Sequence, residues 1–191
     1  MELLKSYLKD FSDAEYKKGF DMMDDVRKSA VMRLRSDKDK RRSVLGEILA
    51  RKGISKICGI PEAEIRFERT ENGKPYAVNA DIRFSISHSK DIVICALSEG
   101  EIGADAELVR DIDLRIAKFA CTDADFEYLY EVEDENERNL RFFKIWTAKE
   151  AYVKYCGTGI SYLRDINFKD IEKNCQFSLD GEYMIAIYRV I

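Results

Sequence analysis

Hydrophobic residues recur every three or four positions in two long segments, which predicts two amphipathic helices. The first covers residues 37–52 and the second covers residues 136–155. We expect these helices to end at Gly53 and Gly157, because glycine readily adopts the left-handed conformation that closes a helix.

Shorter helices are predicted where a polar cap precedes the pattern. Residues 13–24 form one of them, since Ser12 and Glu15 have the spacing of a capping box at its start. Helical patterns also follow Asp113 and Thr122. Helices are therefore expected in both halves of the chain.

Strands are predicted where strand-forming residues run between turn signals or alternate with polar ones. Three consecutive strands begin at Arg83 and should form a meander, and the last two strands should form a hairpin around Asp180-Gly181. The predicted strands are 65–69, 83–89, 92–97, 102–107, 175–179 and 183–190.

The order of these elements predicts the fold class. Helices precede strands in the first part of the chain and again in the second, which is typical of an α+β protein. At 191 residues the chain is one large domain or two small halves, and we divide it into 1–100 and 101–191. The sequence shows no flexible linker between these halves, and the halves are not close sequence repeats of each other.

Composition narrows the class of protein. With 46% hydrophobic residues and only two prolines, the chain can build a core and is neither disordered nor collagen-like. No apolar run has the roughly 18 residues that a membrane span needs, and the first residues lack the pattern of a secretory signal. We therefore expect a cytoplasmic protein without membrane contact.

Cysteine and histidine usage excludes several kinds of site. The five cysteines are scattered without a CxxC pair, so we expect no disulfide framework or cysteine-rich zinc site, and we interpret them as small core residues. His88 is the only histidine, which excludes HExxH metalloproteases. Glycine-rich phosphate loops of the usual spacings are also absent from the sequence.

Charge is unevenly distributed, although the net charge is only −4. Residues 27–56 are rich in lysine and arginine, whereas 99–138 are rich in aspartate and glutamate. Such asymmetry is compatible with a site for a polyanion and equally with solvated helix faces.

His88 lies between Ser87 and Ser89 on a predicted strand. Successive side chains of a strand point to opposite faces, so neither serine is placed to be activated by this imidazole. Two interpretations remain open: a hydrogen-bond donor to an anion, or a half-buried structural histidine.

Asp105 and Glu107 are two residues apart on another predicted strand, which directs both carboxylates to the same side. Their mutual repulsion would be relieved by a hard divalent cation such as Mg²⁺. The alternative, a solvent-exposed acidic strand end, is the commoner explanation of an isolated pair.

The helix predicted over 136–155 carries a lysine where an apolar residue is expected. Lys149 falls in the middle of the apolar arc, so it should reach an anion or a polar cavity, or extend to the surface. Glu150 and Lys154 lie at its edge at the i,i+4 spacing, which also fits a surface ion pair.

Four segments together resemble the 4′-phosphopantetheinyl transferases, specifically the larger, pseudodimeric class of that family. Their order and approximate spacing match, although alanine replaces the usual aliphatic residues at 104 and 106. The segments are Gly73-Lys74-Pro75, Ile86-Ser87-His88-Ser89, Gly103-Ala104-Asp105-Ala106-Glu107 and Trp146 to Lys154.

The resemblance implies two similar α/β halves related by a pseudo-twofold axis, with coenzyme A in the cleft between them. It implies transfer of 4′-phosphopantetheine from coenzyme A to a serine of an apo acyl or peptidyl carrier protein, with release of 3′,5′-ADP and dependence on Mg²⁺. We expect a monomer without nucleic-acid partners. Because such carriers are acidic, we expect docking on the basic first half, with Lys38, Lys40 and Arg41 as candidates.

The same resemblance assigns roles to individual residues. The implied Mg²⁺ ligands are Asp105, Glu107 and Glu150, and the implied phosphate contacts are His88 and Lys154. Glu150 is the implied base, while Lys149 orients a phosphate or carboxylate. The adenine pocket would be lined by Gly73, Lys74, Pro75 and Ser87, and the 3′-phosphate would be held by Arg27, Lys28 and Arg42.

Two other functions remain compatible with the sequence. One is a noncatalytic module of the same fold that binds coenzyme A or a nucleotide without turnover. The other is a nucleic-acid-binding protein that uses the basic segment 27–56, for which salt-sensitive binding is the minimum requirement.

Overall fold

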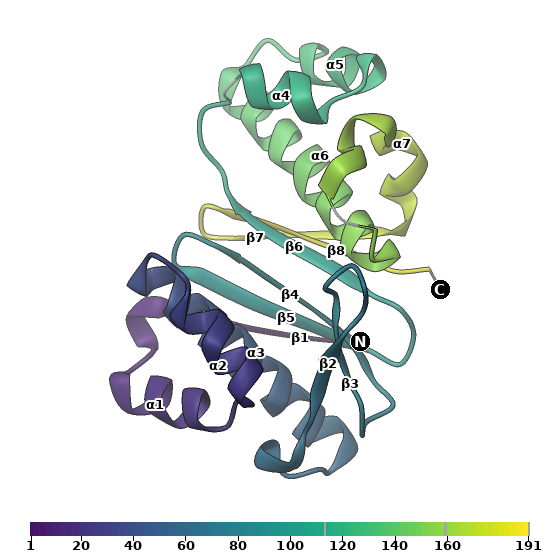
Figure 1. The fold of residues 1–191 in the computed structure, drawn as a ribbon. Helices are drawn as coiled ribbons and strands as arrows, with labels where there is room; N and C mark the ends of the chain where they lie inside the picture. The colour runs from purple at the N-terminus through teal and green to yellow at the C-terminus, as the bar shows by residue number, and fades with distance from the viewer. Residues whose placement is uncertain (113, 159, 191) are drawn as a thin grey trace.

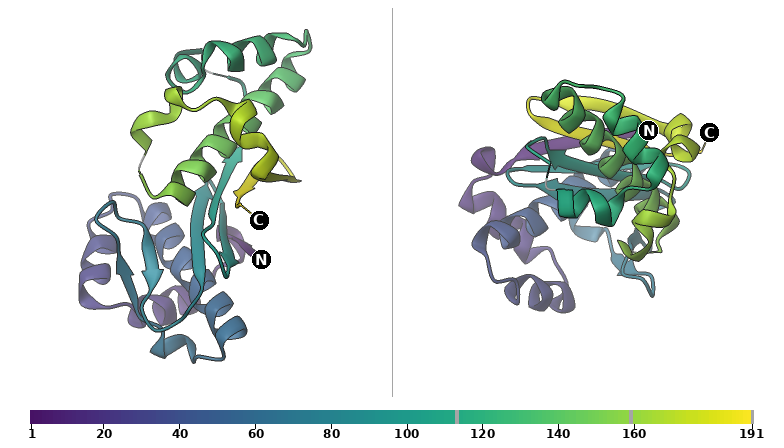
Figure 2. Two further views of the ribbon diagram at one scale, coloured as in Figure 1. Left: turned by 90° about the vertical axis from the view of Figure 1, so that its right-hand side faces the viewer. Right: turned by 90° about the horizontal axis from the view of Figure 1, so that it is seen from above.

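The computed structural model describes residues 1–112, 114–158 and 160–190. Two three-stranded antiparallel sheets meet in the middle of the molecule, and the helices of each half lie on the outer side of their own sheet (Figures 1 and 2). The arrangement leaves two sheet edges, one from each half, side by side at the centre.

The N-terminal half contains a sheet of order β1-β5-β4 and a separate β2–β3 hairpin. Its elements are β1 (Glu2–Tyr7), α1 (Asp13–Asp21), α2 (Asp25–Met32), α3 (Asp37–Cys58), β2 (Phe67–Arg69), β3 (Pro75–Ala77), β4 (Arg83–Ser89) and β5 (Ile92–Ser98). Short 3₁₀ helices cover Leu8–Asp10 and Glu62–Glu64.

The C-terminal half contains a sheet of order β6-β8-β7. Its elements are β6 (Gly103–Leu108), α4 (Leu114–Ala120), α5 (Asp123–Tyr130), α6 (Glu135–Cys156), α7 (Phe168–Ile171), β7 (Cys175–Asp180) and β8 (Tyr183–Tyr188). Short 3₁₀ helices cover Ile160–Asp165 and Glu172–Asn174.

The two halves repeat one topology. Each begins with a strand, continues through helices to a long helix of 22 residues, and ends with an antiparallel strand pair. In both sheets the last strand of the half is central, flanked by the first strand and the next-to-last strand of that half. The expected α+β fold of two similar halves is therefore confirmed, although the two halves show no close sequence repeat.

Helix ends follow local chemistry. The predicted capping box is present, since Ser12 Oγ accepts from the Glu15 amide at 3.2 Å. α6 ends at Gly157, as expected, with a φ of 69°. The predicted stop at Gly53 is wrong, because α3 continues to Cys58. At Gly53 a Cβ atom would meet Leu97 of β5 at 2.6 Å, so this glycine serves close packing.

Strand pairing differs from the sequence expectation in one respect. β4 and β5 pair as predicted, and β7 and β8 form the predicted hairpin. β6 does not complete a meander with β5 but pairs with β8 in the other sheet. The strands β1 and β3 and the helix α2 were not predicted at all.

Three hydrophobic clusters hold the molecule together. Each half has its own core between sheet and helices, and a third cluster lies between the two sheets. This third cluster includes Ile94 of β5, Ala106 of β6 and Ile187 of β8, all almost fully buried. The halves are therefore joined by an apolar interface of their own.

The structure bears on two expectations from composition, the burial of the cysteines and the lack of a membrane-spanning helix. Cys95 and Cys121 are buried, as expected, and Cys175 is half-buried, but Cys58 and Cys156 are exposed at the last positions of their helices. The interpretation of all five as core residues is thus wrong for these two. None of the described helices combines the length and the apolar character that crossing a bilayer requires.

Candidate active site

β4 and β6 lie side by side at the junction of the two halves (Figure 1). On β4, Ile86 faces α3, where its side chain approaches Gly46. Ser87 and Ser89 face β6 on the opposite side, and His88 is exposed. The prediction that His88 points away from both serines is confirmed.

Three carboxylates approach one another at this junction. Asp105 and Glu107 come from β6, and Glu150 comes from α6, where it is 6% exposed. Burial raises the pKa of Glu150 to about 7, with further contributions from the charges of Asp105 and Glu107. Burial and the charge of Asp105 also raise the pKa of Glu107. The positive charge of Lys154 therefore does not fully offset the negative charges of the three carboxylates.

The strand and helix that carry these carboxylates are in backbone contact. At Gly103, the first residue of β6, a Cβ atom would come within 1.8 Å of the Ala151 carbonyl oxygen and 2.5 Å of the Tyr155 amide nitrogen. Glycine is therefore required at this position, because any side chain would separate β6 from α6.

The two carboxylate oxygens of Asp105 differ: one accepts hydrogen bonds, and the other has no partner among the described residues. Its Oδ1 accepts from Ser87 Oγ and Lys154 Nζ, both at 2.6 Å, while Oδ2 is buried and makes no hydrogen bond with the described residues. A buried carboxylate oxygen without a donor is costly unless a cation binds it.

The donor set fits Mg²⁺, which binds through a few carboxylates and completes its coordination with water and substrate phosphates. Among the described residues, no three acidic, histidine or cysteine side chains are close enough to form a finished cation cage. The site would therefore depend on ligands that the substrate brings.

Lys154 faces the same junction. Its ammonium donates to Asp105 Oδ1 at 2.6 Å and to Ser87 Oγ at 2.9 Å, and it forms no ion pair with Glu150. An ammonium group has three donors, so one remains for a phosphate oxygen. The alternative of a simple Glu150–Lys154 surface pair is thus wrong.

Lys149 does not reach this site. Its ammonium is fully buried in the C-terminal half, where it pairs with Asp125 and donates to the Ala120 carbonyl at 2.7 Å. The expectation that it finds an anion is confirmed, but that anion belongs to the protein. We correct its predicted catalytic role to a structural one.

A cavity of about 270 Å³ adjoins Glu150 and Lys154. Its walls come from the β2–β3 loop, from β4 and from α6, and they include Gly73, Lys74, Pro75, Ile86, Glu150 and Lys154. The loop is fixed to the second half, because Lys74 Nζ donates to the Tyr155 carbonyl at 3.0 Å and pairs with Glu101. Ser87, expected in this pocket, binds Asp105 and Lys154 instead.

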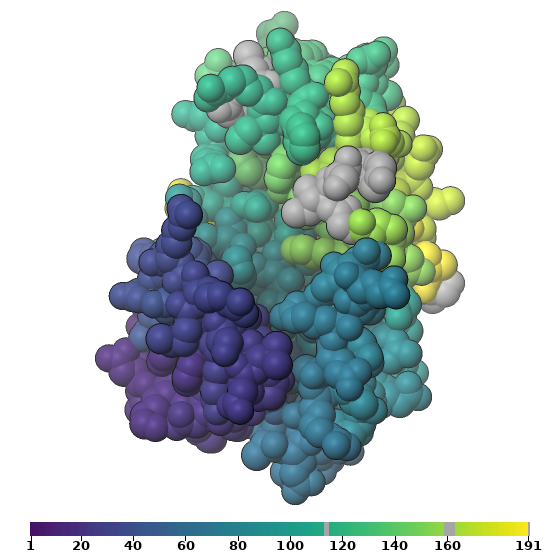
Figure 3. Space-filling view, viewed as in Figure 1, coloured from purple at the N-terminus to yellow at the C-terminus, as the bar shows by residue number. Residues whose placement is uncertain are grey.

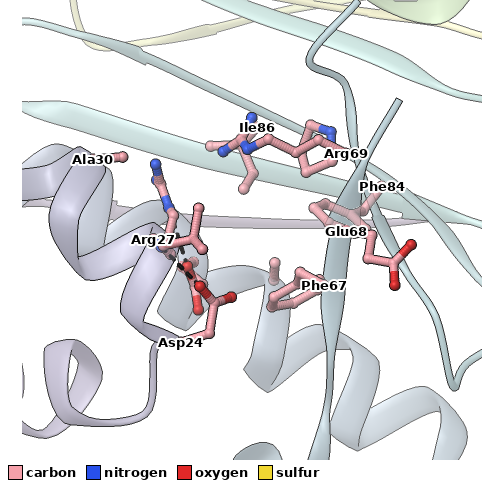
Figure 4. A pocket seen from close by; sticks show the side chains of 12 residues that line it. Asp24, Arg27, Ala30, Phe67, Glu68, Arg69, Phe84 and Ile86 are labelled. Carbon is pink, nitrogen blue, oxygen red and sulfur yellow. Dashed lines mark hydrogen bonds and ion pairs between the residues drawn. The ribbon is translucent and has the colours of Figure 1, made fainter. Parts of the chain in front are cut away.

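A larger cavity of about 470 Å³ continues from the first and shares Pro75, Phe84 and Ile86 with it. Figure 3 shows the resulting hollow between the dark blue helical segment and the teal β2–β3 hairpin. Arg27 and Arg69 enter this cavity from opposite walls (Figure 4). The two cavities form one cleft, which ends at Glu150 and Lys154.

Two arginines of the first half line the larger cavity. Arg27 contacts Glu47 at 3.3 Å and Ser43 Oγ at 2.6 Å. Desolvation, with a further contribution from the charge of Arg27, lowers the pKa of Arg69, while the carboxylates of Glu47 and Asp24 act in the opposite direction. Sequence reasoning missed Arg69; its only signal was its position at the end of a predicted strand.

The other two predicted phosphate-binding residues lie elsewhere. Lys28 is half-buried on α2 and is absent from the lining of both described cavities. Arg42 donates to the Lys90 carbonyl and pairs with Asp39 near the end of β4. Desolvation, together with the charges of Arg42 and Lys154, lowers the pKa of His88. Arg27, Lys28 and Arg42 therefore do not form a single cluster.

Comparison with known proteins agrees with this geometry. The family model "4′-phosphopantetheinyl transferase, N-terminal" matches residues 10–100, and "4′-phosphopantetheinyl transferase superfamily" matches residues 101–186. The chain belongs to the 4′-phosphopantetheinyl transferase superfamily. Its similarity to the transferase Sfp of Bacillus subtilis and related proteins places it in the class with two similar halves.

Three curated relatives illustrate the similarity. The chain is 38% identical to 4′-phosphopantetheinyl transferase gsp of Aneurinibacillus migulanus, over 78% of this chain and 61% of that protein. It is 32% identical to psf-1 of Bacillus pumilus, over 84% and 76%, and 34% identical to Sfp of Bacillus subtilis, over 74% and 63%. The chain thus spans less than two thirds of the length of two of these relatives.

Proposed function

We propose that this protein transfers the 4′-phosphopantetheine group of coenzyme A to a serine of an apo acyl or peptidyl carrier protein, with Mg²⁺ as cofactor. The observation that carries the proposal is the buried, unpartnered Oδ2 of Asp105, beside Glu107 and Glu150 at the end of a two-part cleft. The family membership supports the same reaction.

Coenzyme A would lie along the cleft with its phosphates at two places. The pyrophosphate would meet Lys154, whose third donor is free, and His88 would donate to a phosphate oxygen. The adenine would pack on Pro75 and Ile86, which both cavities share. Arg27 and Arg69 are suited to the 3′-phosphate, because an anion would relieve their mutual repulsion.

The reaction requires a charged pyrophosphate to accept a nucleophile. The serine oxygen attacks the β-phosphorus, the bond to the ADP oxygen breaks, and 3′,5′-ADP leaves. Bound Mg²⁺, held by Asp105, Glu107 and Glu150, would neutralise phosphate charge. Glu150, almost fully buried beside the two carboxylates of β6, is the candidate to accept the serine proton, directly or through a water.

A third cavity gives the carrier access to the other side of the carboxylates. It measures about 430 Å³ and has a charged side formed by Glu107, Arg110 and Asp111 and an apolar side formed by Ile116, Phe142, Phe143 and Trp146. A cavity with one charged and one apolar side would accommodate the residues around the carrier serine while the cleft holds coenzyme A.

The direct test is incubation with Mg²⁺, coenzyme A and a panel of apo carrier proteins. The expected result is a carrier that gains the mass of one phosphopantetheine, with an equal amount of 3′,5′-ADP, and no gain in EDTA. Binding of coenzyme A without either product would instead support the noncatalytic module. Salt-sensitive RNA or DNA binding without product would support the nucleic-acid-binding alternative.

A substitution tests the assignment of the larger cavity. Arg69→Ala should weaken coenzyme A binding about tenfold and leave dephospho-coenzyme A binding unchanged, because only the former carries the 3′-phosphate. Arg66→Ala, on an exposed residue of the same segment, is the matched control. Equal weakening for both ligands would remove Arg69 from the 3′-phosphate site; calorimetry gives both constants.

A further inference from the structure

The junction between β4 and β6 has an unusual construction. The two strands run in the same direction and are neighbours, yet no backbone hydrogen bond joins residues 83–89 to residues 103–108, all of which are described. Serine hydroxyls take the place of backbone acceptors. Ser85 Oγ accepts from the Ala104 amide at 3.0 Å, and Ser89 Oγ accepts from the Leu108 amide at 3.1 Å.

Two of the three serines on this face also bind carboxylates. Ser87 Oγ donates to Asp105 Oδ1 at 2.6 Å, and Ser89 Oγ donates to Glu107 Oε2 at 2.7 Å. Ser85 differs, because its recorded hydrogen bond is to a backbone amide alone. The same period of two that places the serines on one strand places the two carboxylates on the other.

Each of these bonds fixes one oxygen and leaves the other for a different partner. Asp105 Oδ1 is saturated by Ser87 and Lys154, so the buried Oδ2 is the atom that remains. The second oxygen of Glu107 makes no hydrogen bond with the described residues. A carboxylate held in this way binds a cation without first losing side-chain freedom.

We propose that Ser87 and Ser89 are positioning residues that hold Asp105 and Glu107 in the orientation in which their free oxygens bind a divalent cation. This inference rests on the metal site of the proposed function. It assigns the two serines to the cation and not to the adenine or to the histidine between them.

A purely structural role would treat the three serines alike. Each links the two halves, so loss of any one hydroxyl should loosen the junction without a selective effect on cation affinity. Only a positioning role separates Ser87 and Ser89 from Ser85, which makes Ser85→Ala the matched control for metal affinity. Ser89→Thr keeps the hydroxyl on a strand where a β-branched residue is favourable, and it serves as the rescue variant.

The experiment measures Mn²⁺ affinity by electron paramagnetic resonance of free Mn²⁺, with protein saturated by coenzyme A and with coenzyme A alone as the blank. Ser87→Ala and Ser89→Ala should each raise the Mn²⁺ dissociation constant about tenfold, whereas Ser85→Ala and Ser89→Thr stay within about twofold of wild type. Melting temperatures in EDTA measure the loosening of the junction separately, and they should fall least for Ser85→Ala, which loses a bond to a neutral amide only.

Two results would overturn the inference: wild-type protein that binds no Mn²⁺ beyond the blank, or alanine variants at 87 and 89 that match Ser85→Ala. Failure of the proposed function is separate. If wild-type protein produces no 3′,5′-ADP but its Mn²⁺ affinity falls in the two serine variants as expected, the positioning role stands and the transfer reaction does not.

Discussion

The long helices α3 and α6 carry a buried cation at the same position. Arg51 follows the first residue of α3 by the same interval at which Lys149 follows the first residue of α6. Arg51 donates to the Met22 carbonyl, and Lys149 donates to the Ala120 carbonyl, so each cation ties its helix to the end of an earlier helix in its own half. The repeated topology thus extends to one polar contact inside each core.

The partners of the two cations differ. Arg51 pairs with Glu47 on its own helix, whereas Lys149 pairs with Asp125 on α5. The two halves also contribute different side chains to the junction: the N-terminal half contributes Arg27 and Arg69 to the larger cavity, and the C-terminal half contributes Lys154, Asp105, Glu107 and Glu150. The two halves therefore share one topology but differ in the charged side chains that they present at the junction.

The largest effect is expected when the buried cation of the C-terminal half, Lys149, is removed. Lys149→Met should lower the free energy of unfolding by about 3 to 5 kcal/mol, because it leaves the Asp125 charge buried without compensation. Urea denaturation measures the loss, and Lys144→Met, on a more exposed lysine of the same helix, is the control.

A second substitution separates charge from packing. Lys149→Met with Asp125→Asn should be clearly more stable than Lys149→Met alone, because the amide no longer needs a counter-charge. Coenzyme A affinity per folded molecule should equal that of wild type. A large change in that affinity with little loss of stability would return Lys149 to the active site.

Removal of one carboxylate tests whether the cation belongs to the C-terminal half. Glu107→Gln should reduce phosphopantetheine transfer about a hundredfold with little change in melting temperature, because the lost charge matters only when the metal binds. Glu99→Gln, on an exposed glutamate before β6, is the control. Full activity of the Glu107 variant in EDTA would contradict the metal assignment.

His88 tests the contribution of the N-terminal half to phosphate binding. His88→Ala should weaken coenzyme A binding by about 1.5 to 3 kcal/mol, the range of a charge-assisted hydrogen bond. The lowered pKa of His88 means that protonation requires a more acidic solution, so wild type should gain affinity over the variant as pH falls below neutral. Calorimetry of both proteins at several pH values isolates His88 from titration of the ligand; parallel pH curves would argue against the contact.

The smallest effect is expected at the rim of the first half. Arg41 is unsuitable for a charge test, because it binds the Phe11 carbonyl and stacks on that ring. Replacing exposed Lys38 and half-buried Lys40 by glutamate should raise the KM for the carrier about threefold and leave the KM for coenzyme A unchanged. Steady-state kinetics at two ionic strengths measure this; an unchanged carrier KM would mean that docking relies on the C-terminal half.

Sequence patterns were sufficient where the signal is local. The alternation of Ser85 to Ser89 predicted a strand whose serines oppose His88, and the pair Asp105 and Glu107 predicted carboxylates on one side. The capping box at Ser12 predicted a helix start. These features depend on neighbours within a few residues.

The remainder depends on contacts between distant segments. Nothing near Lys149 in sequence reveals Asp125 as its partner, and the approach of Arg69 to Arg27 exists only after the β2–β3 hairpin folds onto the first half. Gly53 resembles a helix stop until β5 lies against it. The pairing of β6 with β8 required the C-terminal hairpin, about 70 residues further along the chain.

The contact at Gly103 limits how this protein could be redesigned. Replacing glycine by alanine in a strand ordinarily raises stability, because it restricts the unfolded chain. At this position the added methyl group would act as a wedge between β6 and the backbone of α6. The damage would therefore extend beyond stability, since the wedge would move Glu150 away from Asp105 and Glu107. A glycine-to-alanine change chosen for thermal stability would here separate the three carboxylates of the candidate metal site.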